Sequence, residues 1–547
     1  MNRIKLISEG CIDHFDVNEN WKCFSFGSII KVLDHDKSFD KNIELITDVK
    51  LKKIRLFKSS IFYLSKDGIL FLFKDFNYRG TNYKILFENI IDFSIIYNKL
   101  YILEKDKISI YNLNPELCLV CDCEVGNICM NIITIEKYVI IFGPSVLIIY
   151  ESNVDSIELF FKTTELVEFP LSITFGNNKF YIADHNLGLI ALKIDKTFEY
   201  LNNKFPIFNP YSVSWINTQL YVVNEKGLYQ INENEYELID NSFSILEIKT
   251  YFNFLYVLKK DRVDYLNEKF INVFNSGGYH FDVSINDNYL YAATENRIIK
   301  FDIDNQSYQN TSLFNHCVRH YAILSFHNHI YYVTENAFFY YSINPKGEFS
   351  NLLYKDENIG NPVSLAYNHE KNILIYSTGM LLQLLDVSDT INRIKDKILF
   401  NTNINSISSI KNIVFLSCGF GGVLYFDLKT PQILKKIKNI SFASDVFITD
   451  KYLSICTSKE LYLFQHESFS KYLCIYKTDK QNDVSKCYII NHYLFYTEGE
   501  KINKFDITTN SITKKIRMPF IPRKIFACSD NDVLISGING IVKINFN

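Results

Sequence analysis

The sequence predicts an all-β fold built from a repeated unit of four short strands, and three observations support this prediction. One equivalent position in the first strong strand of each unit recurs at intervals of 35 to 43 residues, from Phe24 to Ile535, with a mean spacing of about 39. The segments between polar turns alternate with a period of two or are apolar on both faces, as in strands. The chain is also rich in Phe (45) and Tyr (37) but holds only 20 Gly and 10 Pro, which favours strands over disorder.

The repeat period identifies the architecture. Repeats of about 40 residues with four strands each are typical of β-propeller blades. Residues 318–354 serve as the example, with expected strands at Val318–Phe326, Ile330–Thr334, Ala337–Asn344 and Phe349–Tyr354. Fourteen units exceed the four to eight blades of one ring. We therefore predict two tandem seven-bladed β-propellers with fourteen four-stranded blades.

The predicted domain boundary lies at Asn275–Gly278, the best linker in the chain. Residues 1–276 form the expected N-terminal propeller and residues 277–547 the C-terminal one. The last segment, Ile541–Phe546, is the third strand of its blade, so its edge would be exposed. Arg3–Ser8 has no other assignment, and we expect it to be the closing strand of a ring, with blade fourteen of the C-terminal ring as the first choice and the N-terminal ring as the alternative.

Composition limits the partners and the compartment. The net charge is −3, so we expect no general attraction to nucleic acid or to anionic membranes. No run is long and apolar enough to span a bilayer. The N-terminal residues contain no apolar h-region, so we expect no signal peptide and a cytoplasmic protein whose 12 cysteines are thiols.

Two segments resemble the LVIVD-type, WD40-like β-propeller repeat. Leu382–Asp389 and Gly421–Pro431 show its glycine turn or its apolar strand ending in Asp, and only the second has the following Pro. Gly188–Asp195 matches more loosely. No Trp-Asp strand end and no Gly-His entry of the WD type is present. The resemblance implies a propeller fold and a binding role, and it carries no catalytic residues.

Two clusters of potential metal ligands are better explained as structural. The first cluster lies at the two ends of one expected strand, and these ends are roughly 20 Å apart. One metal therefore cannot bind all of its members, and a two-ligand site is the alternative. The cluster comprises His316, Cys317, His320, His327 and His329. Cys118, Cys121 and Cys123 lie in an alternating strand, followed by Cys129, and the alternative there is zinc or a redox pair. We predict neither a metal nor a cofactor.

Acidic residues recur in the turns between the second and third strands, and lysines and arginines are interleaved with them. In a propeller these turns emerge on one end of the ring. Solvated turns are the simpler interpretation. Six residues of these turns are also the candidates for binding on a ring face: Asp184, His185, Glu225, Glu295, Arg297 and Glu335.

No nucleophile elbow, phosphate-binding loop or zinc-protease motif is present. The sequence therefore favours a non-enzymatic scaffold that binds other proteins on its ring faces. The alternative is a hydrolase, lyase or cofactor enzyme with a site assembled in a central channel, for which Asp184, His185, Glu295 and Glu335 are the first candidates. The residues that line the channel would distinguish the two hypotheses.

Overall fold

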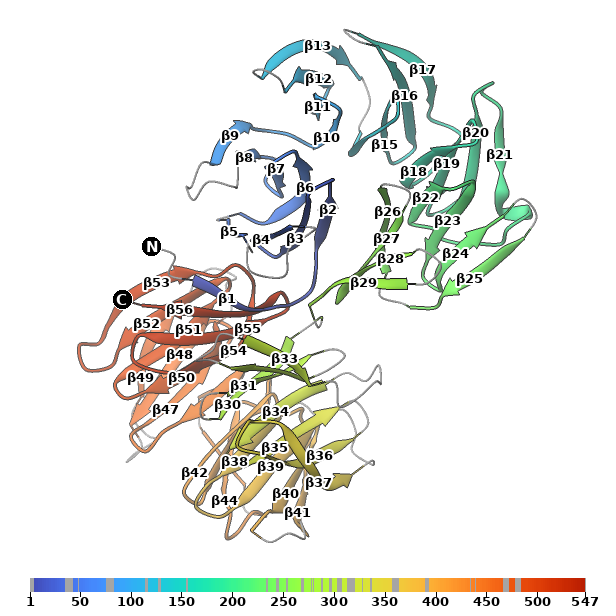
Figure 1. Cartoon of the computed structure of the whole chain (residues 1–547). Coiled ribbons are helices and arrows are strands. Elements are labelled where there is room, and N and C mark those ends of the chain that lie inside the picture. The colour runs from blue at the N-terminus through green and yellow to red at the C-terminus, as the bar shows by residue number, and fades with distance from the viewer. Residues whose placement is uncertain are drawn as a thin grey trace. The chain divides into compact units, whose positions relative to one another are not determined.

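The computed structural model is all-β (Figure 1). It describes the chain except residues 1–3, 35–42, 48, 75–82, 114–116, 126–128, 154–155, 233–234, 243–244, 252–253, 267–269, 277, 279, 287–288, 295–297, 303–306, 312–319, 327, 335–336, 357–363, 389–392, 433, 438, 466–471, 478–483 and 547. Within the described residues the only helical segment is a 3-10 turn, η1 (Leu201–Asn203).

The described strands form fourteen four-stranded antiparallel sheets, as the repeat predicts. Thirteen sheets contain four consecutive strands in chain order. The sheet expected within residues 318–354 contains β34 (His320–Phe326), β35 (His329–Thr334), β36 (Phe338–Ile343) and β37 (Phe349–Asp356). These bounds lie within two residues of those expected, because short polar turns separate strongly apolar runs.

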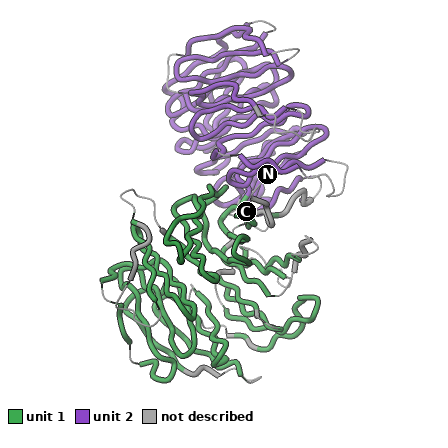
Figure 2. The backbone as a smooth tube through the Cα atoms, turned by 90° about the vertical axis from the view of Figure 1, so that its left-hand side faces the viewer, with its two compact units in different colours: residues 1–11, 276–547 green, residues 12–275 purple. Residues whose placement is uncertain are grey.

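The chain divides into two compact units (Figure 2). Unit 2 comprises Ile12–Asn275, and unit 1 comprises Met1–Cys11 together with Ser276–Asn547. The boundary at residues 275 and 276 falls in the expected linker. The prediction that residues 1–276 form one domain needs a correction, because the first eleven residues belong with the C-terminal sheets.

The N-terminal strand explains this grouping. β1 (Ile4–Glu9) pairs antiparallel with β56 (Gly540–Asn545), with Ile4 opposite Ile544 and Glu9 opposite Gly540. The sheet order is β1, β56, β55 (Asp532–Gly537) and β54 (Pro522–Ala527). The chain's first strand thus fills the fourth place in its last sheet, which is the pairing expected for Arg3–Ser8. It covers an edge that would otherwise leave backbone N–H and C=O groups unpaired.

In each sheet, the strand that we call the first strand carries polar side chains that join neighbouring sheets. It is the first of the four in chain order, except that in the sheet containing β1 it is β54. This strand lies at the edge of its sheet, so only one of its two sides is paired within that sheet. In unit 2 these first strands are β2 (His14–Val17), β6 (Leu51–Phe57), β10 (Asp92–Ile96), β14 (Asn131–Ile135), β18 (Pro170–Gly176), β22 (Ser212–Ile216) and β26 (Ile245–Tyr251). In unit 1 they are β30 (His280–Asn286), β34, β38 (Ser364–Asn368), β42 (Ser406–Ile410), β46 (Asp445–Ile448), β50 (Val484–Ile490) and β54.

A side-chain oxygen on one first strand accepts a backbone N–H from the next first strand, and this bond recurs with the repeat. In unit 2 the carboxylate of Asp16 accepts from Leu56 at 2.7 Å, and the Ser212 hydroxyl accepts from Ile248 at 3.1 Å. In unit 1 Asp445 accepts from Cys487 at 3.1 Å. These bonds satisfy donors on the otherwise open strand edge and join neighbouring sheets.

Apolar side chains fill the space between neighbouring sheets. The second strands are the most buried: in β7 (Ser60–Ser65), Ile61 and Phe62 point to opposite faces and both are buried. Ile61 belongs to the cluster shared with the preceding sheet, whereas Phe62 belongs to the cluster shared with the following one. Burial on both faces explains why these strands are apolar throughout and do not alternate.

Within each unit the last sheet also contacts the first. In unit 2 the Lys249 ammonium on β26 donates to the carbonyl oxygen of Phe15 on β2 at 2.9 Å, and the Phe15 and Tyr256 rings lie 6.3 Å apart. In unit 1 Lys524 on β54 forms an ion pair with Asp282 on β30. The last and first sheets of each unit are therefore in contact.

Candidate functional site

The predicted turn residue Asp184 is structural. It ends β19 (Lys179–Asp184) and is fully buried. One carboxylate oxygen accepts the backbone N–H groups of Glu168 and Phe169, and the other accepts those of Asn186 and Leu187, all at 2.9 to 3.0 Å. Four donors occupy its acceptor sites, so the side chain organises the turn and cannot also act on a ligand.

The other predicted turn residues do not converge on Asp184. His185 is half-buried, with its ring edge toward Phe169 at 6.5 Å. Glu225 is exposed in the turn between β23 (Gln219–Asn224) and β24 (Gly227–Ile231). Glu295, Arg297 and Glu335 lie outside the described residues. The described members of this set therefore do not assemble a reaction centre.

The two predicted ligand clusters give no metal site in the described part of the chain, where no group of three or more His, Cys, Asp or Glu side chains could hold an ion. Cys118, Cys121 and Cys123 lie on the outer strand β13 (Cys118–Glu124), as expected. Burial raises the pKa of Cys129 to about 11, which disfavours the thiolate that a metal needs. In the histidine cluster, His316, Cys317 and His327 lie outside the described residues, as does the His320 side chain.

A different group of charges gathers on the first strands of unit 2, and we call it the inner charge cluster. Its members project from four first strands, β26, β2, β6 and β10. Three of these strands carry a pair of polar side chains two residues apart, which places both on one face. The cluster comprises His14, Asp16, Lys53, Arg55, Asp92, Glu247 and Lys249.

Two ion pairs connect neighbouring first strands of the cluster, and a third lies within β26. Lys53 contacts the carboxylate of Asp92 at 2.9 Å, and the second Asp92 oxygen accepts the backbone N–H of Ile132 at 2.9 Å. Arg55 lies 3.6 Å from Asp16, and Lys249 lies 3.3 Å from Glu247. Three cations and three carboxylates thus pair with each other, which compensates for much of the cost of burying them.

Burial lowers the pKa values of two basic side chains in the cluster. It lowers the pKa of His14 to about 4, against an opposing effect of Glu247. It also lowers the pKa of Lys53 to about 8, partly offset by the attraction of Asp92. His14 is consequently neutral at pH 7. Sequence analysis did not select these residues. A usable signal was present, because H-F-D, K-K-I-R and E-I-K each place two polar residues on either side of an apolar one.

We predict that protonation of His14 destabilises unit 2. Its folded pKa of about 4 lies below the unfolded value of about 6.5, so the unfolded state binds more protons between these pH values. Stability should fall as the pH drops from 6.5 to 4, by up to about 3 kcal/mol. Urea unfolding at a series of pH values, compared with His14→Gln, checks this. The same slope in both proteins would contradict it.

A cavity of about 1320 Å³ opens at the ends of β2, β6 and β10, among the turns after these strands. We call it the turn cavity. It borders the inner charge cluster through Asp16 and Arg55, and four aromatic residues line it: Trp21, Phe57, Tyr97 and Tyr251. Burial, with Glu19 and Asp16 nearby, raises the pKa of Tyr251 to about 12. The cavity therefore combines aromatic surface with charged side chains of both signs.

Tyr97 is the most unusual residue of this cavity. Its side chain is 79% exposed, and its backbone adopts the left-handed region with φ of 53°. The equivalent turn positions with positive φ hold Lys58, Glu136, Asn177 and Asn217. A large aromatic residue is unfavourable both in this conformation and in water. Among these equivalent turn positions, Tyr97 is the one that holds an aromatic residue.

Comparisons with known proteins add one finding on the fold. No family model matches the chain, and no curated protein matches it. The structure is similar, with a TM-score of 0.64 and 9% identity, to PorZ, a bacterial surface component of the type-IX secretion system of Porphyromonas gingivalis. The match covers 100% of this chain and 87% of PorZ. It supports a propeller-like all-β fold, and the resemblance to LVIVD-type repeats stays a prediction.

The same comparison corrects the predicted compartment. PorZ is a component of the bacterial surface, which contradicts the expected cytoplasmic location. That expectation rested on the missing h-region and on the cysteines, and neither observation identifies a compartment.

No helix among the described residues is long and apolar enough to cross a bilayer.

Proposed function

We propose that each unit is a seven-bladed β-propeller in which the four-stranded sheets are the blades. Three observations support this arrangement: seven sheets per unit, the recurring bond between consecutive first strands, and the contact between the last and first sheets. In this arrangement the first strands line a central channel, and the inner charge cluster of unit 2 faces that channel.

We further propose that the protein is a non-enzymatic scaffold that binds another protein at the turn cavity of unit 2. The observation that carries this proposal is Tyr97, an aromatic side chain exposed at a strained turn beside a large cavity. Aromatic side chains dominate the binding energy of many protein interfaces. The similarity to a secretion-system component supports a place in a multi-protein assembly.

The enzyme alternative retains one specific observation, the approach of His14 to Glu247 and Lys249. A neutral imidazole beside a carboxylate is a common acid–base arrangement. However, the Lys249 ammonium already contacts both Glu247 and the Phe15 carbonyl oxygen. A substrate screen in which wild type is active and folded Glu247→Gln is not would favour the enzyme over the scaffold.

We predict that Tyr97→Asn separates binding from stability. Asparagine tolerates the left-handed conformation better than tyrosine, so the variant should melt at the same temperature or higher, with a gain of up to about 1 kcal/mol. Loss of an aromatic anchor should weaken partner binding by more than 2 kcal/mol, or about 30-fold. Affinity capture from native cells, quantified beside wild type, measures this loss. Equal capture of the same partners would refute the proposal.

The matched control is Glu136→Asn, which changes the corresponding turn of the following sheet at a φ of 51° and lies outside the residues that line the cavity. It relieves similar backbone strain but removes no aromatic ring. We expect a similar or smaller change in stability and a much smaller loss of capture.

A further inference from the structure

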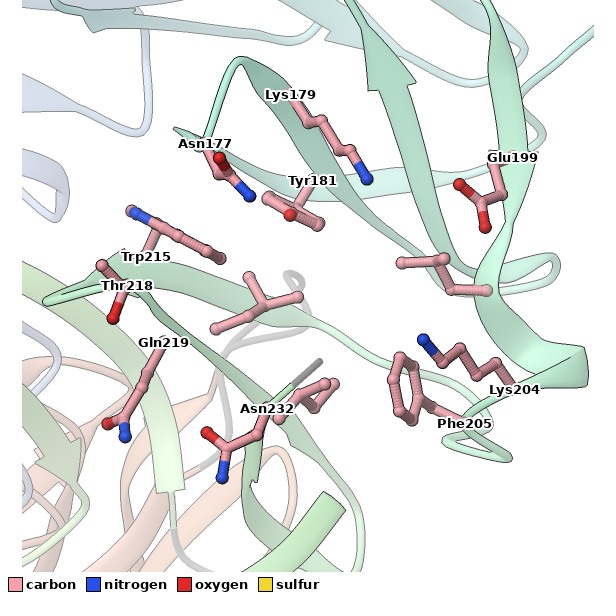
Figure 3. A pocket seen from close by; sticks show the side chains of 13 residues that line it. Asn177, Lys179, Tyr181, Glu199, Lys204, Phe205, Trp215, Thr218, Gln219 and Asn232 are labelled. Carbon is pink, nitrogen blue, oxygen red and sulfur yellow. The ribbon is translucent and has the colours of Figure 1, made fainter. Parts of the chain in front are cut away.

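A second cavity of unit 2 lies between the fifth and sixth sheets, and we call it the Trp215 pocket (Figure 3). Its volume is about 860 Å³. Buried apolar side chains form its floor, including Tyr181, Leu220 and Ile231, while polar side chains surround its opening. Seven of the thirteen lining residues are polar or charged, so the pocket suits a small molecule that has both apolar and polar parts.

The strand register explains why this space is open. Tyr181, Ala191 and Glu199 form one cross-strand row of the fifth sheet. Trp215, Leu220 and Ile231 form a row of the sixth sheet. Ala191 puts a small side chain in the middle of its row. The outer strand β21 (Phe198–Tyr200) has only three residues before the chain turns into η1, so the usual outer wall is short.

The tryptophan is held in a defined position. Its ring stacks on Tyr181, with centroids 5.3 Å apart and planes at 4°. A Cβ atom at Gly176 would lie only 2.0 Å from the Trp215 ring, so the ring packs directly against the glycine backbone. A ligand therefore meets a preformed aromatic wall, which lowers the entropy cost of binding.

Three charged side chains line this pocket, Lys179, Glu199 and Lys204, and the Lys204 ammonium lies over the Phe205 ring, 5.3 Å from its centroid. Lys179 follows the same face of β19 as Tyr181, and Glu199 lies two strands away, roughly 10 Å across the sheet. Figure 3 shows both side chains extending toward the cavity from different sides. Within the described part of the chain, neither side chain has a hydrogen bond or an ion pair. Their nearest electrostatic link is the effect of Glu199 on Tyr181.

We propose that the Trp215 pocket binds a small zwitterion with an apolar side chain, of the free α-amino acid class. The carboxylate of the ligand pairs with Lys179, its ammonium pairs with Glu199, and its apolar side chain covers the floor of Tyr181, Leu220 and Ile231. A ligand with only one charge leaves either Lys179 or Glu199 without a partner. This inference is independent of the proposed scaffold function, because it concerns a different cavity.

The chain provides its own reporter for this site. It contains two tryptophans, so Trp21→Phe leaves Trp215 as the single tryptophan, whose emission can be excited selectively. We would titrate this variant, after checking that it melts like wild type, with four ligands that share a phenyl group: phenylalanine, 3-phenylpropionate, phenethylamine and 2-phenylethanol. These probes are a zwitterion, an anion, a cation and a neutral molecule.

Phenylalanine should change the Trp215 fluorescence saturably and bind about tenfold more tightly than any of the other three probes. In Glu199→Gln, phenylalanine should no longer bind more tightly than 3-phenylpropionate. In Lys179→Gln, phenylalanine should no longer bind more tightly than phenethylamine. Glu158→Gln and Lys226→Gln, which change exposed charges outside the pocket, should preserve both. Equal affinity for the four probes, no response to phenylalanine, or an unchanged preference in Glu199→Gln would overturn the proposal.

Discussion

Asp92→Ala should destabilise unit 2 by about 3–5 kcal/mol, because it leaves a partly buried ammonium without its carboxylate. Asp92 is only 3% exposed, and it joins three sheets by contacting Lys53 and the backbone N–H of Ile132. Both tryptophans, Trp21 and Trp215, lie in unit 2. Urea unfolding followed by tryptophan fluorescence therefore reports this unit directly.

The controls separate the ion pair from the loss of a side chain. Asp122→Ala removes an exposed carboxylate from the same sheet and should cost less than about 0.5 kcal/mol. The double variant Lys53→Met with Asp92→Ala should recover part of the loss, since no unpaired charge remains. A change below about 1 kcal/mol for Asp92→Ala alone would show that the inner charge cluster does not hold these sheets together.

Deletion of residues 1–8 should lower the melting temperature of unit 1 by roughly 6–12 °C. The deletion removes nearly all of β1 and exposes the edge of β56 along the paired positions from Ile4 to Ser8. A net contribution of about 0.5–1.5 kcal/mol for each backbone hydrogen bond gives a loss of about 3 kcal/mol. Calorimetry of the full chain measures the transition, with the tryptophan signal of unit 2 as an internal reference.

Deletion of residues 1–3 alone is the matched control, because β1 begins at Ile4. It should leave the transition of unit 1 unchanged. A normal N-terminal tail frays without a thermodynamic effect. If the longer deletion melts like the shorter one, pairing with β1 contributes nothing to the stability of unit 1.

The strands and their grouping could be predicted because the evidence for them is local. An apolar run between polar turns defines a strand without knowledge of its neighbours, and the fourteen anchors match fourteen sheets. The pairing of β1 with β56 could also be inferred, since Ile541–Phe546 needed a partner and Arg3–Ser8 had none. The domain membership of residues 1–11 was still assigned to the wrong unit, because sequence order took priority over that pairing.

The site residues could not be predicted in the same way. Acids in turns are conspicuous in the sequence, yet Asp184 uses its carboxylate on four local N–H groups. The inner charge cluster draws on strands more than 200 residues apart, from His14 to Lys249. Each strand shows only one or two charges on a face, and their convergence depends on contact between the first and last sheets of the unit.

Tyr97 shows a further limit of sequence reasoning. It is one of 37 tyrosines, and its neighbours match the strand and turn pattern of the other sheets. Only the positive φ and the 79% exposure set it apart from tyrosines such as Tyr101, which is buried in the second strand of the same sheet.

Photo-crosslinking in native cells tests the binding scaffold most directly, because it compares the turn cavity with the opposite set of turns. A photoreactive amino acid would be placed at position 97 or 58, in turns that line the cavity, and at position 185 or 225, in turns between second and third strands. We expect one discrete protein adduct from positions 97 and 58 and none from positions 185 and 225. Adducts from 185 and 225 alone, or from no position, would contradict a binding scaffold that acts through the turn cavity of unit 2.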